Sequence, residues 1–224
     1  MLKLTSEIRK DYVRMKLDWD NFLWPYEVTV RELKTKFRSL RQSFLVEGEH
    51  SPIEFVVGRV KNVDSIEEKM SRRVIQPDVI ETDMQDIAGI RIVCQFVDDI
   101  YRVVDLIHAR TDMEVLEERD YVQNAKPSGY RSYHLVIRYT VYLPSGPKQL
   151  LAEIQVRTLA MNFWATVEHT LNYKYQGVYP DDISARLKSA ATAAYQLDEE
   201  MSTIKDEVRD AQKVFTQNKG KEKS

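Results

Sequence analysis

Two carboxylates occupy positions in this sequence where the surrounding pattern favours apolar residues. Asp86 comes directly before the apolar segment IAGIRIV, and Glu153 interrupts the otherwise apolar segment LLAEIQV. A carboxylate in a central strand is costly unless something cationic satisfies it. In phosphoryl transfer that cation is typically Mg²⁺, held by one or two carboxylates together with the substrate phosphates. The pattern leaves a second interpretation open, in which Asp86 caps the start of its strand and Glu153 faces solvent.

A set of basic residues lies on the first two expected strands and on the helix between them. A nucleoside triphosphate carries several negative charges, so its site needs guanidinium and ammonium donors that converge. A run of charges is more often the solvated face of a helix, and Glu67 and Glu68 neighbour the lysines of this set in the sequence. We therefore expect only part of the set to touch a ligand: Arg59, Lys61, Lys69, Arg72, Arg73 and Arg91.

The segment NAKPSGYRSYHLVI predicts a loop that leads into a strand. Pro127, Ser128 and Gly129 form its turn. An exposed tyrosine beside cations on such a loop is suited to stack on a base, with the charges near its phosphates. The alternative is that Tyr130 and Tyr133 are ordinary strand aromatics, but Tyr130 precedes the strand pattern and we favour the stacking role. The loop presents these side chains: Lys126, Tyr130, Arg131 and His134.

The stronger standalone signatures of nucleotide and metal chemistry are missing from the sequence. There is no GxxxxGK[ST] loop, GxGxxG, HExxH or CxxC pair, and the four histidines, at positions 50, 108, 134 and 169, lack metal-ligand spacing. These absences argue against a zinc enzyme or a P-loop enzyme. With 33 basic and 35 acidic residues, the overall charge gives no reason to invoke nucleic acid or an anionic membrane.

The cellular setting follows from the single cysteine and from the hydropathy. Cys94 cannot form an intramolecular disulfide, lies in an apolar run and is expected to be a small buried residue. No segment approaches the roughly 20 apolar residues that a membrane helix needs. We therefore expect a soluble protein in a reducing compartment, the cytoplasm.

Changes in hydrophobic period divide the chain into elements. Apolar residues at steps of four and three predict a helical hairpin in residues 1–50, with Pro25 ending the first helix and beginning the second. Five segments rich in β-branched and aromatic residues predict strands at 54–60, 88–96, 113–122, 132–143 and 149–157. Between them, Asp64 or Ser65 could cap a helix through Arg73, and Asp98 could cap another. This order predicts an α/β fold (α+β) with a mixed sheet.

The last part of the chain is helical. Thr158 is expected to cap an aromatic-rich helix, and a final helix begins near Asp181 with apolar residues in a heptad pattern up to Phe215. At about 1.5 Å per residue it would run on the order of 50 Å, which favours packing on a partner subunit; the alternative is packing on the N-terminal hairpin. The predicted organisation is one globular domain with an N-terminal helical region (1–50), a core (51–178), an oligomerisation helix (179–216) and a disordered tail (217–224).

Several separated motifs, in order, resemble the synthetase domain of the RelA/SpoT family, specifically the small alarmone synthetases of the RelQ type. They are SPIEFVVGRVKNVDSIEEKM, DIAGIRIVCQFVDDI, SGYRSYHLVI and AEIQVRTLAMNFWATVEHTLNYKY. The resemblance implies a nucleotidyltransferase-like five-stranded sheet flanked by helices. It also implies a GTP diphosphokinase that moves pyrophosphate from ATP to the 3′-hydroxyl of GTP or GDP, releases AMP and yields the alarmone (p)ppGpp.

The same resemblance implies roles for individual residues. Asp86 would hold Mg²⁺, and Glu153 would share the metal or act as the base. ATP would be bound through Arg59 and Arg91 at the adenine and through Lys61, Lys69 and Arg73 at the phosphates. Tyr130 would stack on guanine, with further acceptor-side residues in Lys126, Arg119, His134 and Gln155. Asn162 and Glu168 belong to a matching segment without an implied contact.

The resemblance also implies partners and limits. It implies a homotetramer, and regulation by the alarmone and by single-stranded RNA; the alarmone cleft would involve Lys34, Arg38, Glu54 and Phe55. No histidine is followed by aspartate as in the family's hydrolase domain, so we expect synthesis without hydrolysis. The competing hypotheses are a single-stranded RNA-binding module that keeps the fold, and a nucleotide-sensing scaffold with a degenerate site. Balanced charge and the two carboxylates disfavour the first, and the presence of both carboxylates disfavours the second.

Overall fold

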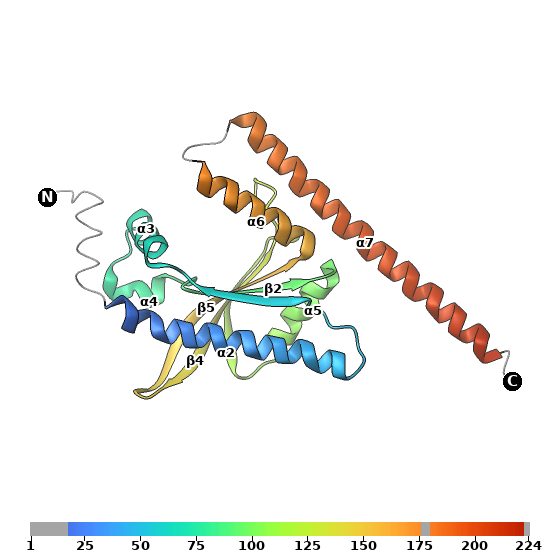
Figure 1. Ribbon diagram of the computed structural model, residues 1–224, viewed down its shortest axis with the longest axis horizontal. Helices are drawn as coiled ribbons and strands as arrows, with labels where there is room; N and C mark the ends of the chain where they lie inside the picture. The colour runs from blue at the N-terminus through green and yellow to red at the C-terminus, as the bar shows by residue number, and fades with distance from the viewer. Residues whose placement is uncertain (1–17, 176–179, 222–224) are drawn as a thin grey trace.

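A mixed five-stranded sheet forms the centre of the molecule, with strand order β1-β2-β5-β4-β3 (Figure 1). The computed structural model describes residues 18–175 and 180–221, with the backbone alone at 173, 174, 214 and 216–221. β2 and β5 run parallel, and the other neighbouring pairs run antiparallel. All five expected strands are present: β1 Phe55–Val60, β2 Ala88–Cys94, β3 Met113–Asp120, β4 Tyr133–Leu143 and β5 Gly146–Thr158.

Alternation along the strands gives the sheet one apolar face and one polar face. In β5, Ala152, Ile154 and Val156 are fully buried in the main core. Glu153 and Gln155 alternate with them and therefore point to the opposite face. Because the register is fixed by this alternation, each polar residue of β5 has a defined neighbour on β2 and on β4.

The long N-terminal helix α2 (Trp19–Val46) covers the apolar face of the sheet. Its buried residues Tyr26, Leu33 and Phe37 have no exposed surface and belong to the main core. Close approach of this helix to β1 requires a glycine at position 58, since a Cβ there would lie 2.8 Å from Ile90 and 2.9 Å from Val30. The first turn is capped by Asp18, whose side chain accepts a hydrogen bond from the Asn21 amide.

The predicted helix break at Pro25 is wrong, because α2 runs through this residue without interruption. A proline inside a helix removes one backbone hydrogen bond and costs about 3 kcal/mol. Here Pro25 is buried, and the turns around it pack aromatic side chains on one another, with ring centroids 5.7 Å apart for Trp19 and Phe22 and 5.5 Å for Phe22 and Tyr26. This packing offsets the lost bond. Residues 8–17 of the expected hairpin lie outside the described residues.

Shorter helices connect the strands and flank the two faces of the sheet. α5 lies on the same side as α2, and its inner residues join the main core, whereas α6 lies on the other side, next to α7 (Figure 1). The connecting elements are α3 (Val63–Arg73), the 3-10 turn η1 (Pro77–Val79), α4 (Ile80–Asp83), α5 (Val97–His108) and α6 (Leu159–Lys174). The polar face of the sheet thus lies between α3 and α6.

The helix caps agree with the sequence prediction in one case out of three. Thr158 caps α6, as expected, by accepting a hydrogen bond from the Met161 amide. Asn62 caps α3, not Asp64 or Ser65, since its side chain accepts from the Ser65 amide at 2.8 Å. Asp98 lies within the first turn of α5 and does not cap it. The predicted caps lie two or three residues after the observed ones, because helix start signals do not fix the exact boundary.

Two simpler expectations are met within the described residues. Cys94 is buried at the end of β2, where burial and the nearby Asp99 and Asp98 raise the pKa of its thiol well above the ordinary value. None of the helices in the described part of the chain combines the length and the apolar character that crossing a bilayer requires.

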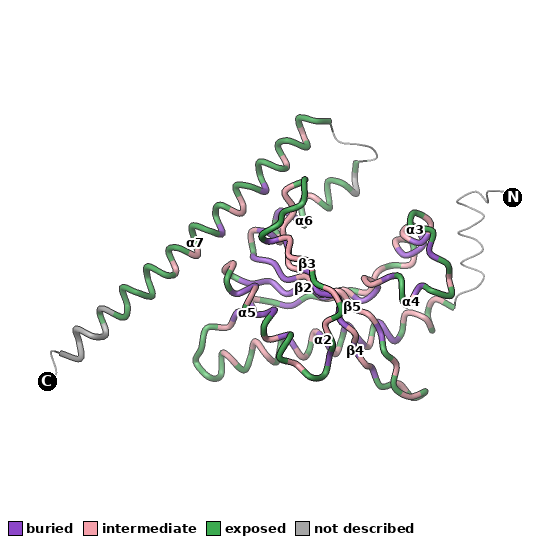
Figure 2. Tube along the Cα trace, turned by 180° about the vertical axis from the view of Figure 1, so that it is seen from behind, coloured by how far each residue is buried: buried purple, intermediate pink, exposed green. Residues whose placement is uncertain are grey.

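The C-terminal helix α7 (Asp181–Lys221) docks through its first half and leaves the second half largely exposed. It packs mainly on α6 and α5, and not on the N-terminal helix (Figures 1 and 2). The indole of Trp164 donates to the Leu187 carbonyl at 2.9 Å, and Thr158 donates to Asp198 at 2.6 Å. The helix continues through Lys221, so the predicted end at 216 and the disordered tail from 217 are corrected as far as residue 221.

We predict that Asp198→Asn stabilises the protein at neutral pH. Asp198 is only 4% exposed, and burial raises its pKa to about 6 although the hydrogen bond from Thr158 opposes this rise. Because the folded state then binds the proton more tightly than the unfolded state, stability from this group is greatest in acid and is lost as the pH rises through about 6.

Urea unfolding at one protein concentration should show the variant about 1–3 kcal/mol more stable than wild type at pH 7.5, and the difference should shrink at pH 5. Asp182→Asn, on an exposed first-turn residue of the same helix, is the control. A variant less stable than wild type at pH 7.5 would contradict this account of Asp198.

Candidate active site

The polar face of the sheet brings together predicted site residues from all five strands. The residue register places one row of side chains across four strands: Arg91, Gln155, His134 and Arg119. An adjacent row crosses three strands: Arg59, Gly89 and Glu153. Since Gly89 has no side chain, the second row leaves the sheet uncovered between Arg59 and Glu153. Residues far apart in the sequence therefore meet at one place only because of the strand order.

Asp86 lies just before β2, and its carboxylate is held by two lysines. Lys69 from α3 donates to Oδ1 at 2.6 Å, and Lys61 donates to Oδ2 at 3.1 Å. Burial alone would raise the pKa of Asp86, but the hydrogen bond from Lys69 and the charges of both lysines outweigh it and lower this pKa. Asp86 is therefore an ionised, half-buried group with cationic partners, and it is more than a cap for the strand.

Glu153 accepts a hydrogen bond at each carboxylate oxygen. His134 Nδ1 lies 2.9 Å from Oε1, and Gln155 Nε2 donates to Oε2 at 2.7 Å. Burial and the nearby charge of Asp86 would raise the pKa of Glu153, but the contacts with His134 and Gln155 lower it below its ordinary value. The side chain is 17% exposed, so the interpretation that it simply faces solvent is wrong.

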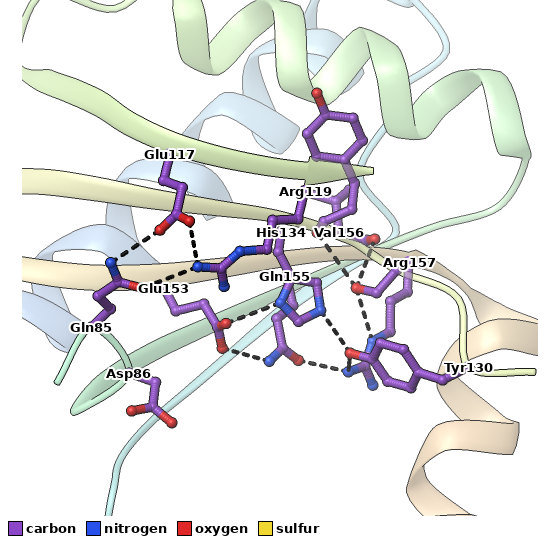
Figure 3. Close-up of polar contacts among 12 residues, drawn as sticks. Gln85, Asp86, Glu117, Arg119, Tyr130, His134, Glu153, Gln155, Val156 and Arg157 are labelled. Carbon is purple, nitrogen blue, oxygen red and sulfur yellow. Dashed lines mark hydrogen bonds and ion pairs between the residues drawn. The ribbon is translucent and has the colours of Figure 1, made fainter. Parts of the chain in front are cut away.

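Glu153 is part of a closed ring of hydrogen bonds (Figure 3). Arg157 donates through Nη2 to the Tyr130 hydroxyl at 2.6 Å and to Gln155 Oε1 at 2.7 Å. The Tyr130 hydroxyl lies 2.7 Å from His134 Nε2. His134 and Gln155 then both contact the carboxylate of Glu153, which closes the ring.

Arg157 is a site residue that the sequence analysis missed. It is 4% exposed at the end of β5, on the same face as Glu153 and Gln155. The pattern Glu-Ile-Gln-Val-Arg, with polar residues at every second position, carried the signal, because alternate residues of a strand share one face. The apolar residues between them indicate a buried strand, and the shared face of the polar residues was overlooked.

Tyr130 is half-buried, which corrects the prediction of an exposed ring. The Lys126 ammonium lies 4.8 Å from its ring centroid, and the Arg157 guanidinium lies 5.1 Å from it. Burial raises the pKa of Tyr130 despite the opposing charge of Arg157, so the phenol stays protonated. The preceding Gly129 has φ +90°, and a Cβ there would lie 2.6 Å from Ala191 of α7. The loop is therefore held against α7.

Arg91 and Arg59 lie close together on β2 and β1, as the resemblance requires. Arg91 donates to Asn162 of α6 at 3.2 Å, so Asn162 supports a site side chain. Burial and the like charges of Arg157 and Arg59 lower the pKa of Arg91. Its Nε is buried without a hydrogen-bond partner among the described residues. Arg59 is exposed on the same face.

The remaining predicted residues are distributed unevenly. Arg119 on β3 bonds Glu117 and Gln85 at the margin of the site. Arg72 and Arg73 are exposed in the last turn of α3. Arg131 lies away from the site, since its guanidinium stacks 3.7 Å from the ring centroid of Tyr195 in α7. Two further residues belong elsewhere too: Tyr133 is a β4 strand residue that bonds Glu118, and Glu168 lies on α6, where it lines the same cavity as Pro127.

The residues expected at an alarmone cleft lie along α2 and at the start of β1. Arg38 donates to the Val56 carbonyl at 3.2 Å, and Glu54 accepts from Gln95 at 2.7 Å. Phe55 is 37% exposed, and the Lys34 side chain passes close to Gly58. Lys34 and Arg38 reach β1 from α2, whereas Phe55 alternates with Val57 and Arg59 and therefore shares their face of β1.

Comparison with known proteins identifies the class. The family model described as "Region found in RelA / SpoT proteins" matches residues 58–178. The GTP pyrophosphokinase YjbM of Bacillus subtilis is 55% identical over 201 residues, which is 90% of this chain and 95% of YjbM. The GTP pyrophosphokinase YwaC of the same organism is 41% identical over 193 residues, 85% of this chain and 92% of YwaC. The chain belongs to the RelA/SpoT family.

Solved structures agree in fold over nearly the same length. The small alarmone synthetase 1 from Bacillus subtilis bound to its product pppGpp superposes with a TM-score of 0.82 at 56% identity, covering 85% of this chain and 97% of that one. A GTP pyrophosphokinase family protein from Streptococcus pneumoniae gives a TM-score of 0.83 at 56% identity, covering 88% and 97%. The expected nucleotidyltransferase-like sheet and long C-terminal helix are thus confirmed, whereas the described residues form the single helix α2 in place of the expected N-terminal hairpin.

Proposed function

We propose that this protein is a GTP pyrophosphokinase, a small alarmone synthetase that makes (p)ppGpp from ATP and GTP or GDP. The observation that supports this most directly is the pair of ionised carboxylates, Asp86 and Glu153, on one face of the sheet among Lys61, Lys69 and the two arginines of β1 and β2. Such a site combines metal-binding oxygens with donors for phosphates. Relatives of the same length at 55% and 41% identity carry the same activity in their names.

The reaction is an exchange of one phosphorus–oxygen bond for another. The 3′-oxygen of GTP or GDP attacks the β-phosphorus of ATP, the bond from that phosphorus to the α–β bridging oxygen breaks, and AMP leaves with this oxygen. Glu153 accepts the proton of the 3′-hydroxyl. Its low pKa keeps it ionised, and both of its oxygens are already held in place by His134 and Gln155.

The residues present fit a Mg²⁺ ion that binds together with substrate. Asp86 and Glu153 give one face of the sheet two ionised carboxylates, which suits Mg²⁺, since this ion is usually held by one or two carboxylates plus substrate phosphates. Asp86 would hold it, with Glu153 as a second ligand. When bound, the ion would offset the charge that develops on the phosphates.

The basic residues divide between the two substrates. Arg59 and Arg91 would hold adenine. Lys61 and Lys69 would exchange Asp86 for the ATP phosphates, and the exposed Arg73 would bind these phosphates as well. Tyr130 would stack on guanine. Lys126, which lies against the ring of Tyr130, and Arg119 at the margin would meet the acceptor phosphates.

The proposed function includes assembly into subunits and regulation by further ligands. The exposed apolar residues of α7 would form the contact between subunits of a homotetramer in the cytoplasm: Leu197, Met201, Ile204, Val208 and Phe215. Lys34, Arg38, Glu54 and Phe55 would receive an alarmone effector between subunits. Single-stranded RNA remains a second candidate regulator.

The test of the proposed function is a product analysis with Mg²⁺, labelled ATP, and GTP or GDP. Wild type should yield AMP and a 3′-pyrophosphorylated guanosine in equal amounts, resolved by anion exchange. Asp86→Asn and Glu153→Gln should lower kcat by roughly 100-fold or more, because one removes a metal ligand charge and the other the proton acceptor.

The matched control is Glu114→Gln, an exposed carboxylate on β3 that pairs with Arg138. This variant should keep wild-type activity. The absence of product from wild type with either acceptor, with and without added alarmone, would reject the proposed function.

We further predict that Lys69→Met changes metal and nucleotide affinity in opposite directions. Lys69 and a divalent cation compete for the same oxygen of Asp86, so Mn²⁺ alone should bind roughly fivefold more tightly to the variant. ATP should bind more weakly, because a phosphate partner is lost.

Paramagnetic resonance of free Mn²⁺ and calorimetry with a non-hydrolysable ATP analogue measure the two effects. Lys148→Met, which removes a surface lysine paired with Glu81, is the control and should change neither. If both affinities fall together in Lys69→Met, Lys69 does not compete with the cation.

A further inference from the structure

Arg157 is a buried cation without a carboxylate partner. Its side chain is 4% exposed, and within the described residues no carboxylate oxygen lies within ion-pair distance of its guanidinium. Its hydrogen bonds go to three neutral groups: Ser132 Oγ at 3.2 Å, the Tyr130 hydroxyl at 2.6 Å and Gln155 Oε1 at 2.7 Å. Buried arginines are rarely left without an anion, so this arrangement calls for a functional reason.

The hydrogen bonds of Arg157 and the carboxylate of Glu153 together set the directions of the bonds in the ring. A guanidinium can only donate, so the Tyr130 oxygen accepts from Arg157, and its own O–H can donate to His134 Nε2. The ionised carboxylate of Glu153 can only accept, so His134 carries a proton on Nδ1, which faces Glu153.

The second arm of the ring is oriented in the same way. Gln155 accepts from Arg157 at Oε1, so its amide nitrogen must face Glu153 Oε2. The two arms, one through Tyr130 and His134 and one through Gln155, therefore both end as donors on the same carboxylate. Reversal of the Gln155 arm would turn its amide NH₂ toward the Arg157 guanidinium, and reversal of the Tyr130 arm would place an unprotonated His134 Nδ1 against the Glu153 carboxylate.

We propose that Arg157 is a positioning residue for the acceptor half of the reaction, which sets the Tyr130 ring and orients His134 and Gln155 toward Glu153. This inference rests on the proposed function, since it assigns Tyr130 to the acceptor and Glu153 to the proton. It gives the Tyr130 hydroxyl a role separate from stacking by the ring. It also requires arginine at position 157, because a lysine has no planar fork with which to meet two oxygens at fixed angles.

The test is steady-state kinetics of the full chain with ATP and GTP, on wild type, Tyr130→Phe, Arg157→Gln, Arg157→Lys and the double variant Tyr130→Phe/Arg157→Gln. Tyr130→Phe keeps the ring and removes only the hydroxyl, and it should lower kcat/KM for GTP about tenfold. Arg157→Gln should lower it by at least as much, with KM for ATP within about twofold of wild type. Arg157→Lys should not restore it.

The double variant separates positioning from a general structural role. If Arg157 acts through Tyr130, removing the hydroxyl after Arg157 is gone should change kcat/KM less than twofold, so the two effects are not additive. Arg138→Gln, on an exposed arginine of β4 that pairs with Glu114, is the control and should match wild type.

Three results would overturn the inference. The first is full activity of Tyr130→Phe, which decides the matter even if the Arg157 variants fail to fold. The second is additivity in the double variant. The third is an equal rise in KM for ATP and GTP in Arg157→Gln, which indicates a purely structural residue. Failure of the proposed function is recognised separately, because wild type and Arg138→Gln would then form no pyrophosphorylated guanosine.

Discussion

The parallel pairing of β2 with β5, in one particular register, is the constraint on which the site depends. It sets Gly89 opposite Glu153 and Arg91 opposite Gln155, and it brings Asp86, just ahead of β2, to the same end of the polar face. A slip of one residue would turn Glu153 into the apolar core and bring Ile154 to the polar face. Burial of Ala152, Ile154 and Val156 against α2 and α5 makes that slip prohibitively unfavourable. The core therefore maintains the geometry of the site.

Both carboxylates of the site are held by neighbouring side chains. Asp86 is neutralised by two lysines, and Glu153 is stabilised by two hydrogen-bond donors that trace back to Arg157. The two carboxylates are thus held differently, one by two lysines and the other by an imidazole and an amide. Under the proposed function, this difference would suit Asp86 to hold a metal ion and Glu153 to accept a proton.

The C-terminal helix α7 supports the loop that carries Tyr130. Ala191 of α7 lies against Gly129, and Tyr195 of the same helix stacks on Arg131. Residues closer to the C-terminal end of α7 expose apolar side chains. The helix that we propose contacts other subunits therefore also supports the loop that carries Tyr130. The bond from Thr158 to Asp198 extends this support to the first turn of α6, which also carries Asn162, the partner of Arg91.

The sequence by itself determined the five strands, the cap at Thr158 and the long final helix, because these follow from local periodicity and capping residues. Charge placed against an apolar pattern also singled out Asp86 and Glu153. The sequence failed at Pro25, where the packing of Trp19, Phe22 and Tyr26 outweighs the local preference of proline. It also failed at Tyr130 and Arg157, since burial and hydrogen-bond direction depend on which strands become neighbours. Only the tertiary structure decided that Arg157, Tyr130, His134, Gln155 and Glu153 close into one ring, because its members come from a loop and two strands whose pairing no local pattern encodes.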